Sequence, residues 1–162
     1  MSKQEQMHIF YSPNVSGSYH ELKGHEARHA LRVLRLAVDE KVIVADGKGR
    51  HYHARISTVS GKTCGLDILE ITQAPAKSFH TEIAVAPPKT AARLEFMLEK
   101  LTELGTDKIT LFVSDHSERK KVKHERLEKI LIAAVKQSKN FYLPQLRSLP
   151  VFDDLLNEKF DG

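Results

Sequence analysis

The 162 residues of this chain are 41% hydrophobic and 28% charged, which excludes a disordered or fibrous protein and allows one ordinary domain or two small ones. The formal charge of +4 and an isoelectric point near 9.1 favour a nucleic-acid partner wherever lysine and arginine cluster. A single cysteine, Cys64, excludes an intramolecular disulfide, and because no segment is apolar enough for a signal peptide or a membrane span, we expect a soluble, untargeted, cytoplasmic protein.

The first half of the chain predicts a small, mostly antiparallel β unit with one helix. Apolar and β-branched residues between turn residues predict strands over residues 7–11, 41–45, 50–59 and 63–71. A helix is expected over residues 25–36, because apolar residues recur there at helical spacing, at Ala27, Ala30, Leu31 and Leu34. This pattern predicts a first, β-rich domain over residues 1–73.

The second half predicts an α/β domain over residues 81–162, after a polar linker over residues 74–80 that contains a proline. A strand, a helix closed by Gly105 and a second strand are expected in turn, over residues 82–86, 90–104 and 108–113. Strand, helix and strand in this order imply a right-handed βαβ unit and a parallel sheet.

Two further helices are expected over residues 124–138 and 151–159. In the helix that begins at residue 90, the apolar stripe predicted to face the core consists of Leu94, Met97, Leu98, Leu101 and Leu104. Two predicted strands are too few for a finished parallel sheet, since such sheets need both faces covered. We therefore expect residues beyond Gly162, or a partner, to complete this domain.

Residues 25–29 read His-Glu-Ala-Arg-His, a pattern that in zinc proteases places two imidazoles on the metal and a glutamate beside it as base. Arg28 and Arg32 would bring guanidinium groups next to the ion, and no spacing for a third ligand follows downstream. A zinc hydrolase is therefore a distant alternative, and we expect no metal site.

The same helix carries Arg28, Arg32 and Arg35 at helical spacing, opposite its apolar side. Arginine forks on a helix can grip phosphates, so these residues predict an RNA-facing surface. The neighbouring strand adds a second basic group, made of Arg50, His51, His53 and Arg55. The alternative for each side chain taken alone is an ordinary solvated residue.

In the second half, Lys89 and Arg93 follow the carboxyl end of the strand over residues 82–86, the edge where open α/β sheets place their ligands. They are candidates for binding an anion, and the alternative is a helix flank paired with Glu99 and Glu103. Residues 117–123, Ser-Glu-Arg-Lys-Lys-Val-Lys, follow the next strand at the same edge. Their cations predict a phosphate-contact surface made of Arg119, Lys120, Lys121 and Lys123.

Taken together, these segments resemble the RsmE family of ribosomal RNA methyltransferases over nearly the whole chain. The family's N-terminal PUA-like RNA-binding barrel is similar to the first set of motifs, His29–Arg35, Asp46-Gly47 and Tyr52-x-Ala54. The start of its methyltransferase domain is similar to the second set, Arg93–Glu95, Lys100–Gly105, Ser117–Arg119 and Gln137-Ser138.

The resemblance implies a PUA-like domain followed by a SPOUT-type α/β parallel-sheet domain with a C-terminal trefoil knot. It implies a homodimer that transfers a methyl group from S-adenosylmethionine to N3 of a uridine in 16S rRNA of the small ribosomal subunit. In that mechanism Arg93 and Arg119 would stabilise the uracil anion and Glu103 would act as an orienting carboxylate. Lys89 and Lys123 would then contact phosphates.

The chain departs from the family's pattern in two places. It has Lys136-Gln137-Ser138 and then Lys139-Asn140, where the family commonly has Glu-Gln-Ser or Glu-Gln-Cys and then an arginine. The family's cofactor-binding segments, a G-P-E-G-G loop and an L-G-x-x-I-L-R-x-E-T-A run, would lie beyond Gly162. We therefore expect the chain alone to bind RNA weakly and neither to bind cofactor nor to methylate. The alternative is a non-catalytic RNA-binding or ribosome-binding module.

Overall fold

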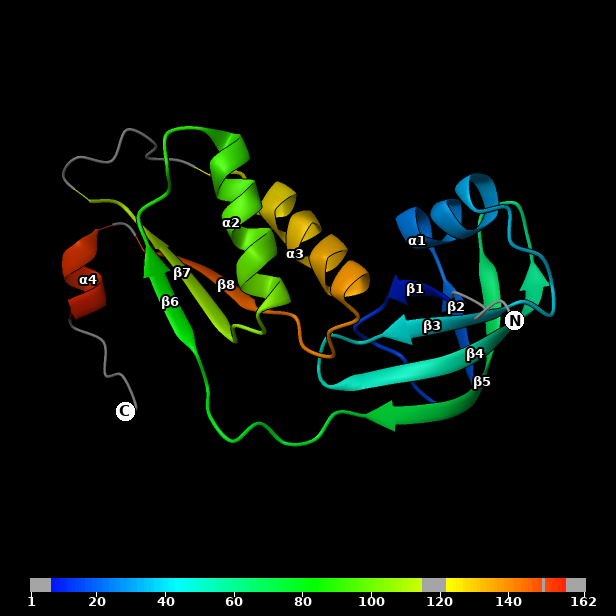
Figure 1. Ribbon diagram of the computed structural model, residues 1–162. Coiled ribbons are helices and arrows are strands. Elements are labelled where there is room, and N and C mark those ends of the chain that lie inside the picture. Colours follow the sequence, from blue (N-terminus) through cyan, green and yellow to red (C-terminus); the bar gives the residue numbers. More distant parts are fainter. Residues whose placement is uncertain (1–6, 115–121, 150, 157–162) are drawn as a thin grey trace, which may run out of the picture. The chain divides into compact units, whose positions relative to one another are not determined.

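The computed structural model describes residues 7–114, 122–149 and 151–156 of the chain (Figure 1). The chain divides into two compact units, Met1–Pro75 and Ala76–Gly162, each with its own buried core. As the sequence predicts, a β-rich unit comes first and a parallel α/β unit follows. Within the described residues, no helix has the length and apolar character needed to cross a membrane.

The first unit is a curled five-stranded sheet, a half-barrel, with a short helical segment against it (Figure 1). Its strands lie in the order β1-β3-β4-β5-β2, and only the β1–β3 pair is parallel. Their bounds are β1 His8–Tyr11, β2 Tyr19–Leu22, β3 Lys41–Ala45, β4 Arg50–Val59 and β5 Cys64–Gln73. The core lies inside the curl and includes Phe10, Val42, Ile56, Leu66 and the two helix alanines.

The predicted helix over residues 25–36 is wrong in length and in form. A short α-helix, α1 (Gly24–Arg28), continues directly into a wider π-helical turn, η1 (His29–Val33). Arg35 then adopts a left-handed backbone conformation, with φ of 56°, which ends the helix. The left-handed conformation at Arg35 turns the chain so that the Leu36 side chain enters the core. The amide of Leu36 donates to the carbonyl of Ala30 at 3.0 Å.

Strand β2 was not expected from the sequence. It lies at the edge of the sheet and pairs only with β5, where Leu22 stands opposite Cys64. A four-residue edge strand has little periodicity of its own, so its partner decides its structure. Tyr19, at its start, covers Gly65 on β5, and a Cβ at that glycine would clash with the Tyr19 hydroxyl and with Oγ1 of Thr58.

The second unit is a three-stranded parallel sheet in the order β6-β7-β8, with α2 and α3 packed together on one face (Figure 1). Its elements are β6 Glu82–Val85, α2 Ala91–Glu103, β7 Lys108–Phe112, α3 His124–Ser138, β8 Gln145–Leu149 and α4 Phe152–Leu156. The core joins both helices to β7 through Leu94, Leu98, Ile109, Leu111, Leu127 and Leu131. The predicted parallel βαβ unit is confirmed.

Three details of this unit differ from the prediction. The sequence predicts no element over residues 145–149, where β8 lies, because Gln-Leu-Arg-Ser-Leu has little strand character away from β7. Leu104 is 81% exposed, so its assignment to the core stripe is wrong. Thr102 takes the buried position at the end of α2, with its hydroxyl donating to the carbonyl of Leu98 at 2.7 Å. Of the helix expected over residues 151–159, the structure describes α4, and residues 157–162 lie outside the described residues.

The segment predicted to be a linker is tied to the second unit at Lys77. Its ammonium group donates to the carbonyl of Gly105 at 2.8 Å and forms an ion pair with Asp107, at the start of β7. The other carboxylate oxygen of Asp107 accepts from the amide of Thr81 at 2.9 Å. Burial opposes ionisation of Asp107, yet the hydrogen bonds and charges from Lys77, Thr81 and His80 together hold its pKa below the ordinary value.

Candidate nucleic-acid interface

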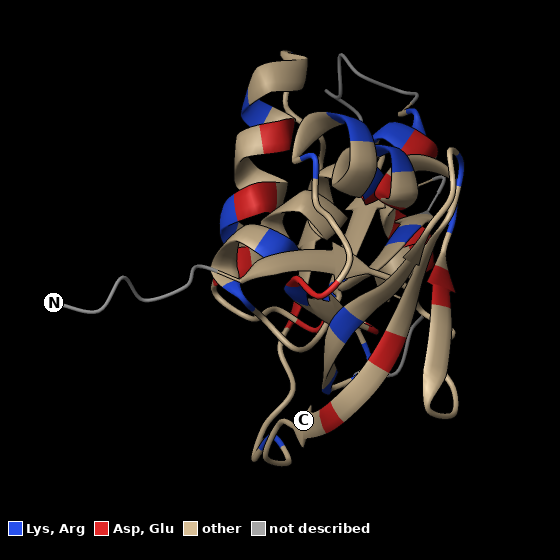
Figure 2. Cartoon of the chain, turned by 90° about the vertical axis from the view of Figure 1, so that its right-hand side faces the viewer, with Lys and Arg blue, Asp and Glu red and all other residues tan. Residues whose placement is uncertain are grey.

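A basic pocket of about 300 Å³ lies on the first unit, between its helical segment and the turn that joins β4 to β5. The residues that line it are Gly24, Arg28, Leu31, Arg32, Gly61 and Lys62. Arg28 is the last residue of α1, and Arg32 lies in the π-helical turn η1 that follows it. The two arginines therefore line the pocket from either side of the point where α-helix changes to π-helix. Figure 2 shows where lysine and arginine fall on this unit.

The cations of this pocket have no counter-charge among the described residues. Arg28, Arg32 and Lys62 form no ion pair with any described residue, and all three are exposed. Two other cations of the same unit, Lys23 and Arg55, are paired with carboxylates. Lys23 lies 2.9 Å from Glu21, and that hydrogen bond raises the pKa of the lysine and lowers that of the carboxyl group. The pocket therefore concentrates positive charge that the protein does not neutralise itself.

Arg35 does not belong to this pocket. It lies past η1, in the left-handed turn, and it is exposed. The expectation that three arginines share one helix face therefore fails for Arg35, because the helix ends before it. The structure brings Arg28 and Arg32 together and adds Lys62 from a distant turn.

Of the four basic residues expected on β4, His51 is buried, His53 is half-buried, and Arg50 and Arg55 are exposed. His51 is 6% exposed, and the Tyr52 ring lies in the core with its hydroxyl 3.5 Å from Asp46. The Arg55 guanidinium lies 3.6 Å from carboxylate oxygens of both Asp39 and Asp67. These contacts show that His51, Tyr52 and Arg55 interact mainly within the protein. None of the described residues of β4 lines the basic pocket.

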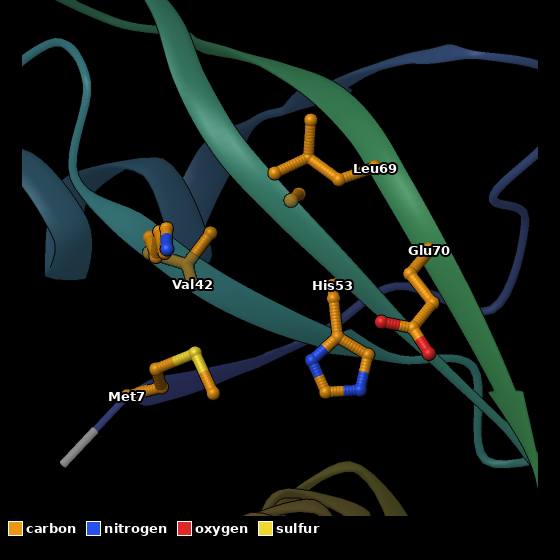
Figure 3. Close-up of a pocket in the computed structure, with 7 residues that line it drawn as sticks. Met7, Val42, His53, Leu69 and Glu70 are labelled. Carbon is orange, nitrogen blue, oxygen red and sulfur yellow. The ribbon is translucent and has the colours of Figure 1, made fainter. Parts of the chain in front are cut away.

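A second pocket of the first unit, of about 270 Å³, lies over β3, β4 and β5 (Figure 3). The pairing of β4 with β5 is irregular here, because Ala54 lies opposite Ile68 while His53 lies opposite Glu70, which leaves Leu69 as an extra residue. In Figure 3 the His53 ring and the Glu70 carboxylate lie side by side in this pocket, with Met7 across from them. A carboxylate in the lining makes this pocket a poor site for phosphate.

The His-Glu-Ala-Arg-His segment is explained by packing of the helix on β1. The His29 ring contacts Phe10 edge to face, with centroids 6.0 Å apart, and the His25 ring stacks on it at 6.4 Å. Oε2 of Glu26 accepts the amide of Tyr11 at 3.2 Å. Within the described residues, no three histidine, cysteine, aspartate or glutamate side chains come together as a possible metal site. The zinc-hydrolase alternative finds no supporting geometry there.

In the second unit, Lys89 and Arg93 are both exposed and lie near the start of α2, after the carboxyl end of β6. The structure therefore brings these two cations to the same edge of the sheet. Glu103 is the last residue of α2, ten residues beyond Arg93, which corresponds to about 15 Å along the helix. It accepts hydrogen bonds from Lys100 at 2.9 and 3.0 Å. The structure does not place Glu103 with Arg93.

Arg119, Lys120 and Lys121 lie outside the described residues. Lys123, which is exposed, immediately precedes α3 and lines a pocket of about 470 Å³ beside that helix. This pocket also contains carboxylates, and two of its cations are paired: Arg126 with Glu95 at 2.6 Å and Lys129 with Glu125 at 2.7 Å. The charge of this surface is thus mostly compensated within the protein.

The departure from the family pattern at Asn140 has a structural role. Its side-chain amide donates to the carbonyl of Thr102 at 2.7 Å and to that of Glu103 at 3.3 Å. These carbonyls lie at the end of α2, where the helical hydrogen bonds stop, and that of Thr102 also accepts from the amide of Gly105 at 3.0 Å. Asn140 therefore connects the end of α3 to the end of α2.

Lys62 is the functional candidate that sequence reasoning missed. In the sequence it belongs to a Ser-Gly-Lys turn, whose lysine would be solvated in most hairpins. Only the approach of this turn to α1 and η1 gives Lys62 two arginine neighbours.

Comparison with known proteins agrees with both units. A family model described as an RNA methyltransferase domain matches residues 75–162, and one described as an RNA methyltransferase PUA domain matches residues 22–69. A solved structure of a probable rRNA-methyltransferase from Porphyromonas gingivalis is 35% identical, with a TM-score of 0.84, over 95% of this chain and 65% of that chain.

A ribosomal RNA small subunit methyltransferase E from Neisseria gonorrhoeae, solved with S-adenosyl methionine bound, is also similar. It is 25% identical, with a TM-score of 0.82, over 96% of this chain and 67% of that chain. The chain therefore spans 65 to 67% of the length of these two relatives.

Proposed function

This chain belongs to the RNA methyltransferase family, and on that premise we propose that it acts in the S-adenosylmethionine-dependent methylation of N3 of a uridine in 16S rRNA. The observation that carries the proposal is that an RNA methyltransferase domain and its PUA domain occur together in one chain. The S-adenosyl methionine bound to the Neisseria relative supports this choice of cofactor. We place the reaction in the cytoplasm, on the small ribosomal subunit, and propose a homodimer as the active form.

The two cations that lie after β6 do not fit the sulfonium group of the cofactor. S-adenosylmethionine carries a positively charged sulfonium, and the side chains gathered after β6 are the cations Lys89 and Arg93, which would repel it. We therefore assign no described residue to the cofactor. Residues 1–162 alone should neither bind it nor methylate RNA, and calorimetry that detected tight S-adenosylmethionine binding by this chain would contradict the proposal.

The chain's own residues are proposed to act on the RNA. N3 of uridine carries an imide proton, so it becomes a good nucleophile only as that proton is lost and negative charge develops on the base. A guanidinium near the base would stabilise that charge. We assign this role to Arg93 and Arg119, and phosphate contacts to Lys89, Lys120, Lys121 and Lys123. Glu103 pairs with Lys100 at the far end of α2, so any orienting role would act on another part of the substrate.

Reverse transcription tests the function directly, because a methyl group on N3 blocks the Watson–Crick edge and stops the polymerase. We expect a stop at one uridine of 16S rRNA in cells that carry the intact gene and read-through in cells that lack it. Restoring the gene with Arg93→Ala should leave the stop weak, while Lys48→Ala, at an exposed lysine whose ammonium group bonds the carbonyl of Pro13, should restore it. An unchanged stop in cells without the gene would refute the proposed reaction.

The second candidate function is a non-catalytic RNA-binding or ribosome-binding module. The basic pocket favours it, because this pocket is complete within the described residues of the first unit. The two functions differ in a simple way. A module would bind small ribosomal subunits, yet loss of its gene would leave every methylated uridine in place.

A further inference from the structure

The basic pocket of the first unit joins two segments that are far apart in the sequence. Arg28 and Arg32 come from the helical segment, and Lys62 comes from the turn between β4 and β5, some thirty residues later in the chain. The three cations line one concave surface of about 300 Å³, and none of the described lining residues is acidic. We call Arg28, Arg32 and Lys62 the cradle.

Three positive charges in one pocket repel each other, and like charges four residues apart on a helix are themselves destabilising. The protein relieves such repulsion elsewhere with carboxylates, as at Lys23 and Arg55. In the cradle no described residue provides that relief. A bound anion would remove the repulsion and satisfy guanidinium donors that are otherwise left to water.

The glycines of the pocket leave room for a ligand to approach. A Cβ built at Gly24 or at Gly61 would meet no atom within 4 Å, so both stretches of backbone border open space. Gly24 has φ of 58°, which favours glycine over other residues there. No side chain covers the pocket at these two positions.

From this arrangement we propose that the cradle grips one phosphodiester group of the RNA substrate, with Lys62 as the third contact beside Arg28 and Arg32. The proposal rests on the proposed function for the identity of the ligand, since RNA is the polyanion that an RNA methyltransferase meets. Lys62 then fixes the β4–β5 turn against the RNA backbone, and the two arginines hold the same phosphate from the helix.

Binding of a fluorescein-labelled RNA hairpin with single-stranded flanks, titrated against the whole chain at several salt concentrations, tests the proposal. Lys62→Gln should weaken binding about five- to tenfold and lower the salt slope by about 0.7 to 0.9, the value for one lost phosphate contact. Lys62→Arg should restore most of the affinity. The matched control is Lys48→Gln, which removes the same charge from the same unit at a lysine that bonds only the carbonyl of Pro13.

A double variant separates a shared phosphate from general attraction. If Arg32 and Lys62 hold one phosphate, the loss in Arg32→Gln/Lys62→Gln should be clearly smaller than the product of the single losses, whereas independent charges give the product. Equal effects of Lys62→Gln and Lys48→Gln, or strictly multiplicative losses, would overturn the cradle and leave the proposed function standing. If the wild-type chain does not bind RNA, the proposed RNA substrate is contradicted, and so is the proposal that the cradle binds a phosphate of that RNA.

Discussion

Each unit has a pocket lined by three cations, but only the pocket of the second unit also has carboxylates in its described lining. In the first unit, Arg28, Arg32 and Lys62 share a pocket with no acidic residue in its described lining. In the second, two of the three cations that line the pocket beside α3, Arg126 and Lys129, are matched by Glu95 and Glu125 at distances of 2.6 and 2.7 Å. If the cradle binds RNA as proposed, the difference teaches that basic residues form a binding surface where the fold places no carboxylate beside them.

The comparison requires that the units hold their shape separately, and core substitutions give the largest test of this. Leu66→Ala in the first core and Leu98→Ala in the second should each destabilise their own unit by about 2–5 kcal/mol, because both side chains are fully buried. Hydrogen exchange during mild urea treatment should then show lost amide protection confined to the altered unit. Equal loss of protection in both units would mean that their surfaces cannot be compared as independent regions.

A smaller effect is expected at Gly65, which lies near the turn that carries Lys62. Gly65→Ala would place a methyl group against the Tyr19 hydroxyl and the Thr58 side chain, at a cost of about 1–3 kcal/mol. The strain should loosen the β4–β5 turn and lower RNA affinity as well as the urea midpoint. Gly61→Ala, where a Cβ meets nothing, is the control for stability. An unchanged urea midpoint for Gly65→Ala would show that Tyr19 moves aside freely.

Replacing Asp107 tests whether the ion pair with Lys77 contributes to the folding stability of the second unit. Its pKa is lower in the folded protein, so its contribution is complete above the ordinary carboxyl pKa of about 4 and is lost as the pH falls through the folded value. Asp107→Asn should therefore be less stable than wild type at neutral pH, and the difference should shrink below about pH 4. Urea midpoints across this range measure it, with Glu128→Gln, an exposed carboxyl group of α3, as the control. A difference that stays constant with pH would contradict the assignment.

The smallest changes in stability are expected when single surface arginines are replaced, and they compare a paired cation with an unpaired one directly. Arg126→Gln breaks the pair with Glu95 and should cost about 0.2–1 kcal/mol of stability in the second unit, because the arginine is 64% exposed. RNA affinity should stay within about twofold, since this charge is already matched. Arg32→Gln should do the reverse, with little loss of stability and about tenfold weaker RNA binding. Similar RNA affinities for the two variants would remove the distinction between paired and unpaired cations.

Much of the fold follows from local pattern. The strands β3, β4 and β7 and the helices α2 and α3 lie close to their predicted ranges, because each has enough residues to show its period. Of the candidate sites, Arg28, Arg32, Lys89 and Arg93 lie where the sequence places them, on the first helix and at the start of α2. Their roles stay predictions, as do those of the residues in the loop before α3.

By itself, the sequence determined the division into a β-rich half and a parallel α/β half, because alternation and helical spacing are properties of consecutive residues. Only the tertiary structure decided that β2 and β8 are strands, since each is a short edge strand that depends on one partner. It also decided which cations are free to bind a ligand. Ion pairing depends on which distant segments meet: Arg55 reaches Asp39 and Asp67, whereas Lys62 reaches a pocket that already holds two arginines.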